Sequence, residues 1–254
     1  MPMDKSDKPY LLVSDLDDTL LGNSSALRRF RDYYVSECAD LVDVVYSSGR
    51  FADSIRNDLS ESDLPKPSYI IGGVGSEIRS YPDNQVMEDW EAAMSTDWSA
   101  DRVVHTLEDD DTMKLQPQSS QSAFKVSYCY PNATQDHLEK VRRRLSEAGL
   151  KTNIIYSSQE DLDILPAGVD KGTAAEFVAR HLGYANEQVI TAGNSGNDAT
   201  LLKHGFHGIV VANAHHQLRD LVRKYHAYQS PNDHAAGVED GLRHWLKRLQ
   251  NSND

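Results

Sequence analysis

Two carboxylates, Asp15 and Asp17, stand two residues apart directly after the apolar run 10–13. A short apolar run that ends in polar residues indicates a buried strand opening into a loop. In open α/β sheets, ligands bind at that end of the strands. Because residues i and i+2 of an extended chain point to the same side, both carboxylates can reach one site. Two like charges so close need a cation or a proton between them, and the plain alternative is a solvated acidic turn.

Three further segments carry polar chemistry at the ends of predicted elements. They are Ser47-Ser48-Gly49-Arg50 after a strand, Asp170-Lys171-Gly172 at a helix start, and Ala192-Gly193-Asn194-Ser195-Gly196-Asn197-Asp198 after another strand. Each segment alone is ordinary loop chemistry. Together with the two carboxylates, and in this order, they predict one composite site at the carboxyl edge of a sheet.

Alternating short apolar runs and amphipathic runs predict the elements that hold these segments. The expected strands are 10–14, 42–46, 69–71, 188–192 and 208–211, and the expected helices are 25–36, 51–59, 171–182, 198–204 and 237–249. This alternation is typical of a parallel sheet with crossover helices.

The middle of the chain follows a different pattern. A long polar stretch precedes a predicted strand at 123–128, a helix at 135–147 and a strand pair at 152–156 and 161–165. We therefore predict an α/β protein with a Rossmann-like parallel-sheet core, formed by residues 1–82 and 167–254, and an inserted α+β cap at 83–166. The polar run 116–122 and the tail 250–254 are the segments expected to be flexible.

Composition restricts the classes of partner. The chain has 254 residues and a formal net charge of -13, which argues against nucleic acid and against anionic membranes as partners. It contains no apolar stretch of membrane-spanning length and no apolar signal core. Cys38 and Cys129 are far apart, as reduced thiols of a cytoplasmic protein would be. The ten histidines are scattered and predict no histidine metal site.

The four segments resemble the motifs of the haloacid dehalogenase superfamily of phosphatases, and the resemblance covers nearly the whole chain. Within that superfamily the chain is similar to the sucrose-phosphate phosphatases and to their relatives that act on mannosylfructose phosphate. The residues that carry this closer likeness lie at 72–78, 124–128, 156–158, 161–166 and 208–214. The segments 28–32 and 241–245 lean toward the mannosylfructose type.

The resemblance implies a role for each catalytic residue. Asp15 would be the nucleophile that forms an aspartyl phosphate, and Asp17 the general acid that later activates water. Ser48 would donate a hydrogen bond to the phosphoryl group, and Lys171 would supply a positive charge beside it. The implied cofactor is Mg²⁺, which prefers hard oxygen ligands, and the implied metal-site residues are Asp15, Asp17, Asn194 and Asp198.

The resemblance also implies a set of substrate-binding residues, most of them in the loops and in the cap. They are Ser48, Gly49, Arg50, Gly75, Ser76, Lys125, Ser158, Asp161, Asp163 and Asn197. Lys125 can equally face solvent from a strand, and Asp163 can simply end a strand face. Trp90 and Trp98 can stack on a sugar, but packing in the core of the cap is the favoured interpretation.

Asn194 departs from the family pattern, which has a metal-ligating aspartate at this position. An amide oxygen brings no charge, so weaker Mg²⁺ binding is expected.

The predicted function is hydrolysis of the 6-phosphate of a fructosyl disaccharide phosphate. The protein is expected to be a monomer with a functional link to a sugar-phosphate synthase. The cap is expected to close over the core about linkers near 80–88 and 165–170. The alternatives are a phosphatase of glycosylglycerate or glycosylglycerol phosphates, and a non-catalytic regulator that binds sugar phosphate.

Overall fold

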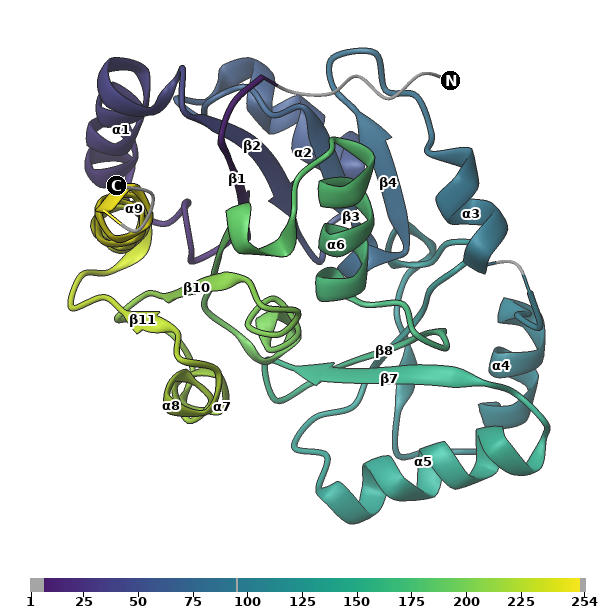
Figure 1. Cartoon of the computed structure of the whole chain (residues 1–254). Coiled ribbons are helices and arrows are strands. Elements are labelled where there is room, and N and C mark those ends of the chain that lie inside the picture. The colour runs from purple at the N-terminus through teal and green to yellow at the C-terminus, as the bar shows by residue number, and fades with distance from the viewer. Residues whose placement is uncertain (1–6, 95, 252–254) are drawn as a thin grey trace.

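A seven-stranded sheet runs through the larger part of the computed structural model, which describes residues 7–94 and 96–251 (Figure 1). Its strand order is β11-β10-β9-β1-β2-β3-β4, and every neighbouring pair is parallel except β3 with β4. The strands are β1 (Tyr10–Ser14), β2 (Val42–Ser47), β3 (Tyr69–Gly72), β4 (Glu77–Ser80), β9 (Val189–Gly193), β10 (His207–Val210) and β11 (Tyr228–Gln229).

Helices cover both faces of this sheet, as the apolar sequence of β1 requires. Leu12 packs in one cluster with residues of α1 (Ser24–Tyr33), α2 (Ala52–Glu61) and α9 (His234–Asn251). Leu11 and Val13 pack in a second cluster, together with α3 (Glu88–Met94) and α6 (Lys171–His181). Successive strand residues point to opposite faces, so a strand buried on both sides is apolar throughout.

A second, antiparallel sheet is built by the middle of the chain, in the order β5-β6-β8-β7. Its strands are β5 (Lys114–Leu115), β6 (Val126–Cys129), β7 (Thr152–Ser157) and β8 (Asp161–Pro166). Two helices, α4 (Ala100–Leu107) and α5 (Gln135–Glu147), bury their apolar stripes against it in a separate core (Figure 1). The predicted fold class, a parallel-sheet α/β core with an inserted α+β cap, is confirmed.

The predicted helix at 198–204 is wrong. Only a single 3₁₀ turn, Gly196–Asp198, forms there. The Thr191 hydroxyl donates to the carbonyl of Leu201, and the backbone N–H of Gly172 donates to the Thr200 hydroxyl. These hydrogen bonds to residues outside the segment stabilise a non-helical conformation of the connection between β9 and β10.

Other boundaries also differ from prediction. The first helix ends at Tyr33 and continues as the π-helical turn Tyr34–Cys38. The strand predicted at 123–128 begins only at Val126, because a turn brings the N–H of Lys125 to the carbonyl of Ser122. The elements that the sequence analysis missed are α3, α4, β4, β5, β11, α7 (His216–Arg219) and α8 (Val222–Tyr225). They are short, so their sequence periodicity is weak.

The polar run 116–122, expected to be flexible, is tied down by its own side chains. Gln121 donates from its amide to the carbonyls of Gln116 and Ser127, and its amide oxygen accepts from the N–H of Ser127. The other expected flexible segment, 250–254, lies outside the described residues from 252 onward. Within the described ranges, no helix is long and apolar enough to cross a membrane.

Candidate active site

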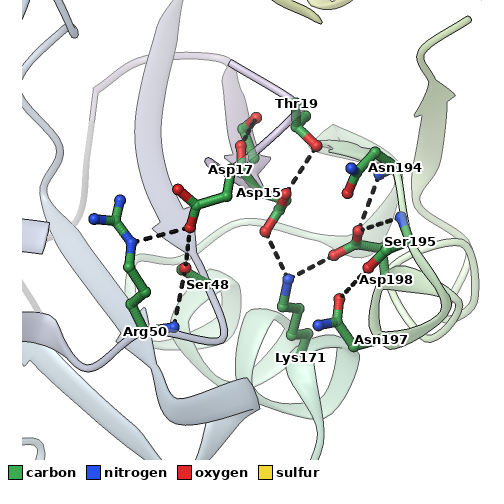
Figure 2. A network of polar contacts seen from close by, with 11 residues as sticks. Asp15, Asp17, Thr19, Ser48, Arg50, Lys171, Asn194, Ser195, Asn197 and Asp198 are labelled. Carbon is green, nitrogen blue, oxygen red and sulfur yellow. Dashed lines mark hydrogen bonds and ion pairs between the residues drawn. The ribbon is translucent and has the colours of Figure 1, made fainter. Parts of the chain in front are cut away.

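Asp15 follows β1 directly and is fixed from three sides. Its N–H donates to the carbonyl of Ala192, at the end of the neighbouring strand β9. One carboxylate oxygen accepts from the hydroxyl of Thr19 at 2.8 Å, and the other receives the ammonium of Lys171 at 2.7 Å (Figure 2). The turn after β1 folds back onto the carbonyl of Leu16, and this places Thr19 above the carboxylate.

Lys171 is the first residue of α6, and its side chain is 0% exposed. The helix start is set by Asp170, whose carboxylate accepts from the N–H of Thr173 while the Thr173 hydroxyl accepts from the N–H of Asp170. This reciprocal capping fixes the helix end. The Lys171 ammonium lies 2.7 Å from Asp15 and 2.7 Å from Asp198, which come from two different strand ends.

Two glycines let the start of α6 approach the loops this closely. A Cβ on Gly172 would lie 2.4 Å from the carbonyl oxygen of Thr200. A Cβ on Gly75 would lie 2.4 Å from the carbonyl oxygen of Asp170, and Gly75 also has a φ of +102°. Only a residue without a side chain fits either position.

Burial controls the electrostatics of this cluster. Burial, and then the charge of Asp198, raise the pKa of Asp15 to about 7 against the opposing effect of Lys171. Burial alone would lower the pKa of Lys171, but the charges of Asp15 and Asp198 outweigh it and the pKa rises. The lysine is therefore protonated, and it lies between the two carboxylates in a buried cluster.

Asp17 lies at the mouth of the site, where its side chain is 55% exposed. Its carboxylate is paired with the Arg50 guanidinium at 2.9 Å, and the Ser48 hydroxyl lies 3.5 Å away (Figure 2). Arg50 is also paired with Asp58 at 2.5 Å. The two carboxylates of the first motif thus have different surroundings: Asp15 is buried against a lysine, and Asp17 is accessible and paired with an arginine.

Both carboxylate oxygens of Asp198 have partners within the protein. One of its carboxylate oxygens accepts from the N–H groups of Asn194 and Ser195, and the other pairs with Lys171. It therefore shapes the loop after β9 and orients the lysine. No group of three or more His, Cys, Asp or Glu side chains in the described chain is arranged to hold a metal ion.

The donor atoms around Asp15 nevertheless suit Mg²⁺. Asp15, Asp17 and Asn194 line one small cavity of about 260 Å³. They bring carboxylate and amide oxygens, which are hard ligands of the kind that Mg²⁺ prefers. Asn194 is nearly buried and uses its backbone, not its amide, in the hydrogen bonds to Asp198 and His215. Its amide oxygen is thus available toward the cavity.

A larger cavity of about 600 Å³ lies between the loops of the parallel sheet and the second sheet. Lys125, the residue before β6, and Asp163 of β8 line it as a nearly buried ion pair at 3.2 Å. The hydroxyl of Ser127 donates to Asp163 at 2.6 Å, and Lys125 stands over the Phe51 ring of the opposite wall. Lys125 therefore does not face solvent.

The two cavities are lined in common by residues from both sheets. They share Gly49, Arg50, Ser158, Asp161 and Asn197. All five belong to the predicted substrate-binding set, together with Ser48, Lys125 and Asp163, which line one cavity each.

Two predicted substrate-binding residues lie elsewhere. Gly75 and Ser76 are buried and are not among the residues that line these two cavities. The carbonyl of Gly75 accepts from the indole N–H of Trp90, whose ring packs 5.0 Å from that of Phe177. Trp90 thus packs against the core helix α6, not in the cap, whereas Trp98 packs against the cap cluster.

Several lining residues were missed by the sequence analysis. Gln116, Ser119 and Ser120 come from the polar run that was expected to be flexible, and Gln116 donates to Asp161 at 2.9 Å. Thr19, which binds Asp15, stands four residues after it in the same motif. Its spacing was a usable signal, whereas nothing in the local sequence marks Gln116 as part of a site.

The fold and the site together define a class. A carboxylate after β1, a hydroxyl after β2, a lysine at the start of α6 and an acidic loop after β9 meet at one edge of a parallel sheet that carries an inserted α+β cap. A haloacid dehalogenase-like hydrolase from Bacillus subtilis has the same fold, with a TM-score of 0.65 and 18% sequence identity over 94% of this chain and 92% of that one. The protein has the haloacid dehalogenase fold.

Residues 8–246 match the family model described as sucrose-6F-phosphate phosphohydrolase, and the chain belongs to that family. It is 32% identical to a mannosylfructose-phosphate phosphatase of Agrobacterium fabrum, over 94% of this chain and 98% of that protein. It is also 32% identical to sucrose-phosphatase 2 of Nicotiana tabacum over 88% of this chain, although it spans only 54% of that longer protein.

A comparison with solved structures agrees with the sequence comparisons. The sucrose-phosphatase of Synechocystis sp. PCC6803, determined in complex with sucrose and phosphate, superimposes with a TM-score of 0.87. The two chains share 28% sequence identity, and the match covers 94% of this chain and 98% of that one.

Proposed function

We propose that this chain is a Mg²⁺-dependent phosphatase that hydrolyses the 6-phosphate of a fructosyl disaccharide phosphate. The observation that carries the proposal is the pair of adjoining cavities. The smaller one holds the nucleophile candidate Asp15, and the larger one, about 600 Å³, has the size of a small-molecule site. The phosphate of the substrate would lie at Asp15 in the smaller cavity, and its sugar rings would lie against the second sheet in the larger cavity.

In the first step, a carboxylate oxygen of Asp15 attacks phosphorus in line with the ester oxygen. The bond between phosphorus and the sugar oxygen breaks, Asp17 gives its proton to the departing alkoxide, and an aspartyl phosphate forms on Asp15. Lys171 stays protonated and holds Asp15 in the attacking orientation. Asp15, the backbone carbonyl of Asp17 and the amide of Asn194 would hold Mg²⁺, which would supply positive charge to offset that of the phosphoryl oxygens.

In the second step, Asp17 takes a proton from water and the resulting hydroxide attacks the phosphorus of the intermediate. The acyl phosphate bond breaks, inorganic phosphate leaves and Asp15 regains its carboxylate. Before the first step, Asp17 must leave its ion pair with Arg50 at 2.9 Å and take up the proton that it then donates. We propose that the phosphoryl group takes over Arg50 at that stage, because a guanidinium binds phosphate as well as carboxylate.

The cap supplies the groups suited to sugar hydroxyls. Gln116, Asp161 and Asp163 offer an amide and carboxylates that pair with vicinal hydroxyls. The likeness to the mannosylfructose-phosphate phosphatase over 98% of that protein supports a mannosylfructose phosphate substrate, and the likeness to sucrose-phosphatases supports sucrose 6-phosphate. We further propose that the cap comprises residues 83–166. We also propose that the protein is a cytoplasmic monomer that is functionally linked to a sugar-phosphate synthase.

The test is phosphate release in the presence of Mg²⁺ from sucrose 6-phosphate, mannosylfructose phosphate, fructose 6-phosphate and glucosylglycerate phosphate, with the Asp15→Asn variant as the blank. We expect one of the two fructosyl disaccharide phosphates to be hydrolysed well above the others, and the blank to be inactive. Preference for glucosylglycerate phosphate would move the assignment to that substrate class.

Asn194 favours one second candidate, a regulator that binds sugar phosphate without hydrolysing it. An amide in place of a carboxylate removes a negative charge from the metal site. This candidate predicts that sucrose 6-phosphate raises the melting temperature of the protein but releases no phosphate, even at high Mg²⁺ concentration. Turnover that the Asp15→Asn substitution abolishes excludes it.

A further inference from the structure

A separate, basic cavity of about 670 Å³ lies on the parallel sheet, away from the active site. It is formed by residues 202–207, which lead into β10, by α8 and the residue after it, and by the last turns of α9. His207 is the first residue of β10, so the cavity opens at the amino edge of the sheet. The nucleophile candidate Asp15 follows the carboxyl end of β1, at the opposite edge.

The charges of this cavity are opposite to those of the whole chain. Lys203, Lys224 and Arg248 line it, and none of its lining residues in the described chain is Asp or Glu. The net charge of the chain is -13, so such a grouping is a local exception. Neither Lys203 nor Lys224 forms an ion pair with a described carboxylate. Their ammonium groups are therefore available to an anion.

Two glutamates contact the histidines of the wall, Glu176 through its carboxylate and Glu187 through its backbone carbonyl. Glu176 pairs with His204 at 3.3 Å, and the backbone carbonyl of Glu187 bonds to His207 at 3.0 Å. Burial, followed by the charge of Arg248, lowers the pKa of His207, so this ring is neutral at neutral pH. A neutral imidazole contributes a flat apolar surface, not a further charge.

Aromatic rings form the rest of the wall. The His207 and Trp245 ring centroids lie 4.6 Å apart, and the indole N–H of Trp245 donates to the carbonyl of Gly208 at 3.1 Å. This bond fixes the indole against β10. Tyr225 lies beneath the ammonium of Lys224, which stands 5.1 Å from the ring centroid. The cavity thus combines flat rings with three cationic side chains.

We propose that this cavity binds a nucleoside diphosphate, with the base against the rings of His207 and Tyr225 and the phosphates between Lys203, Lys224 and Arg248. Flat aromatic surface suits a base, which stacks through its π-face. The two ammonium groups of Lys203 and Lys224 match the two phosphates of a diphosphate better than they match a single monoester. The cavity volume is in the range of small-molecule sites.

The test is calorimetric titration of the full-length protein with ADP and with UDP in EDTA, which prevents hydrolysis. Adenosine serves as the ligand without phosphate, and pyrophosphate as the ligand without a base. We expect one of the two nucleotides to bind at one site, and both partial ligands to bind at least about tenfold more weakly.

Two pairs of substitutions distinguish nucleotide binding in the cavity from a nonspecific attraction to positive charge on the surface. Lys224→Ala and Lys203→Ala remove lining charges, whereas Arg223→Ala and Lys247→Ala remove exposed charges from α8 and α9 that do not line this cavity. We expect nucleotide affinity to fall about tenfold in the first pair and to change less than about twofold in the second. Ser48→Ala, in the active site, should leave the affinity unchanged.

Four results would overturn the proposal. The first is the absence of nucleotide binding at millimolar concentration. The second is a loss of binding in Ser48→Ala but not in Lys224→Ala, which would assign the anion to the active site. The third is pyrophosphate binding as tight as that of ADP and UDP, which would leave no role for the rings. The fourth is an equal loss of affinity in both pairs of variants, which would leave no role for the cavity. A thermal melt of each variant checks that it is folded.

Discussion

Substitution of Lys171 by methionine is the perturbation whose outcome follows most directly from the structure. The side chain is 0% exposed, and its ammonium lies 2.7 Å from a carboxylate oxygen of Asp15 and 2.7 Å from one of Asp198. Methionine keeps most of the length and the apolar stem but removes the charge. Two carboxylates then face each other across a buried space without a cation.

We expect the free energy of unfolding to fall by about 3–5 kcal/mol, which is the cost of leaving a buried charge without its partner. The loss depends on pH. Burial and Asp198 already raise the pKa of Asp15 to about 7, and removal of Lys171 raises it further. A carboxyl group whose folded-state pKa is raised stabilises the fold while it is protonated, and this stability is lost as the pH rises through that pKa. Below about 7, Asp15 binds a proton in both proteins, so the deficit is smaller at pH 6 than at pH 9.

The assay is urea unfolding of the wild type and the variant at pH 6 and pH 9, in EDTA so that no metal replaces the lysine. Lys247→Met, at an exposed position on α9, is the matched control and should change stability by less than about 0.5 kcal/mol. The double variant Lys171→Met with Asp15→Asn should recover part of the loss, because it leaves one buried charge instead of two. A deficit that is equal at both pH values, or a double variant no more stable than the single one, refutes the reasoning.

Three further predictions concern the metal, the substrate and the cap. Asn194→Asp adds a carboxylate to the small cavity, and we expect the Mg²⁺ concentration that half-saturates the rise in melting temperature to fall about tenfold; an unchanged value contradicts the metal role. Gln116→Ala removes the bond to Asp161 at 2.9 Å. It should raise the KM for the disaccharide phosphate about tenfold but leave the hydrolysis of p-nitrophenyl phosphate, which has no second ring, unchanged; equal effects on both substrates contradict it. Burial alone would raise the pKa of Asp110, but hydrogen bonds from Thr112 and the charges nearby outweigh it, and the pKa is lowered. The stability that Asp110 provides is present above its unfolded pKa of about 3.9 and is lost as the pH falls through the folded value. Asp110→Asn should therefore destabilise the protein at pH 7 and less at pH 3, and an equal deficit at both pH values contradicts this.

The local sequence was sufficient to predict those elements whose own residues indicate a buried strand or a capped helix start. The strands β1, β2 and β9 are apolar because both of their faces are buried, and the polar residues after them mark the edge where ligands bind. The start of α6 is marked by Asp170 and Thr173, which cap the helix within four residues. These signals were enough to bring Asp15, Ser48 and Lys171 to one edge of the sheet.

Local sequence was insufficient where the partner of a residue is distant. The segment 198–204 has a helical pattern, but hydrogen bonds from Thr191 and Gly172 hold it in another conformation. Gln116 belongs to a polar run without periodicity, and only its hydrogen bond to Asp161 brings it to the larger cavity.

The sequence by itself therefore determined the fold class, the order of the motifs and the residue types available for phosphoryl chemistry, because strand burial, helix capping and turn chemistry act over a few residues. Only the tertiary structure decided how those residues are paired. Lys171 is 156 positions from Asp15, and the two meet because parallel strands and the α6 start converge at one edge. The ion pair of Asp17 with Arg50, the burial of Trp90 against α6 and the adjoining cavities likewise depend on packing between distant segments, which sequence spacing does not specify.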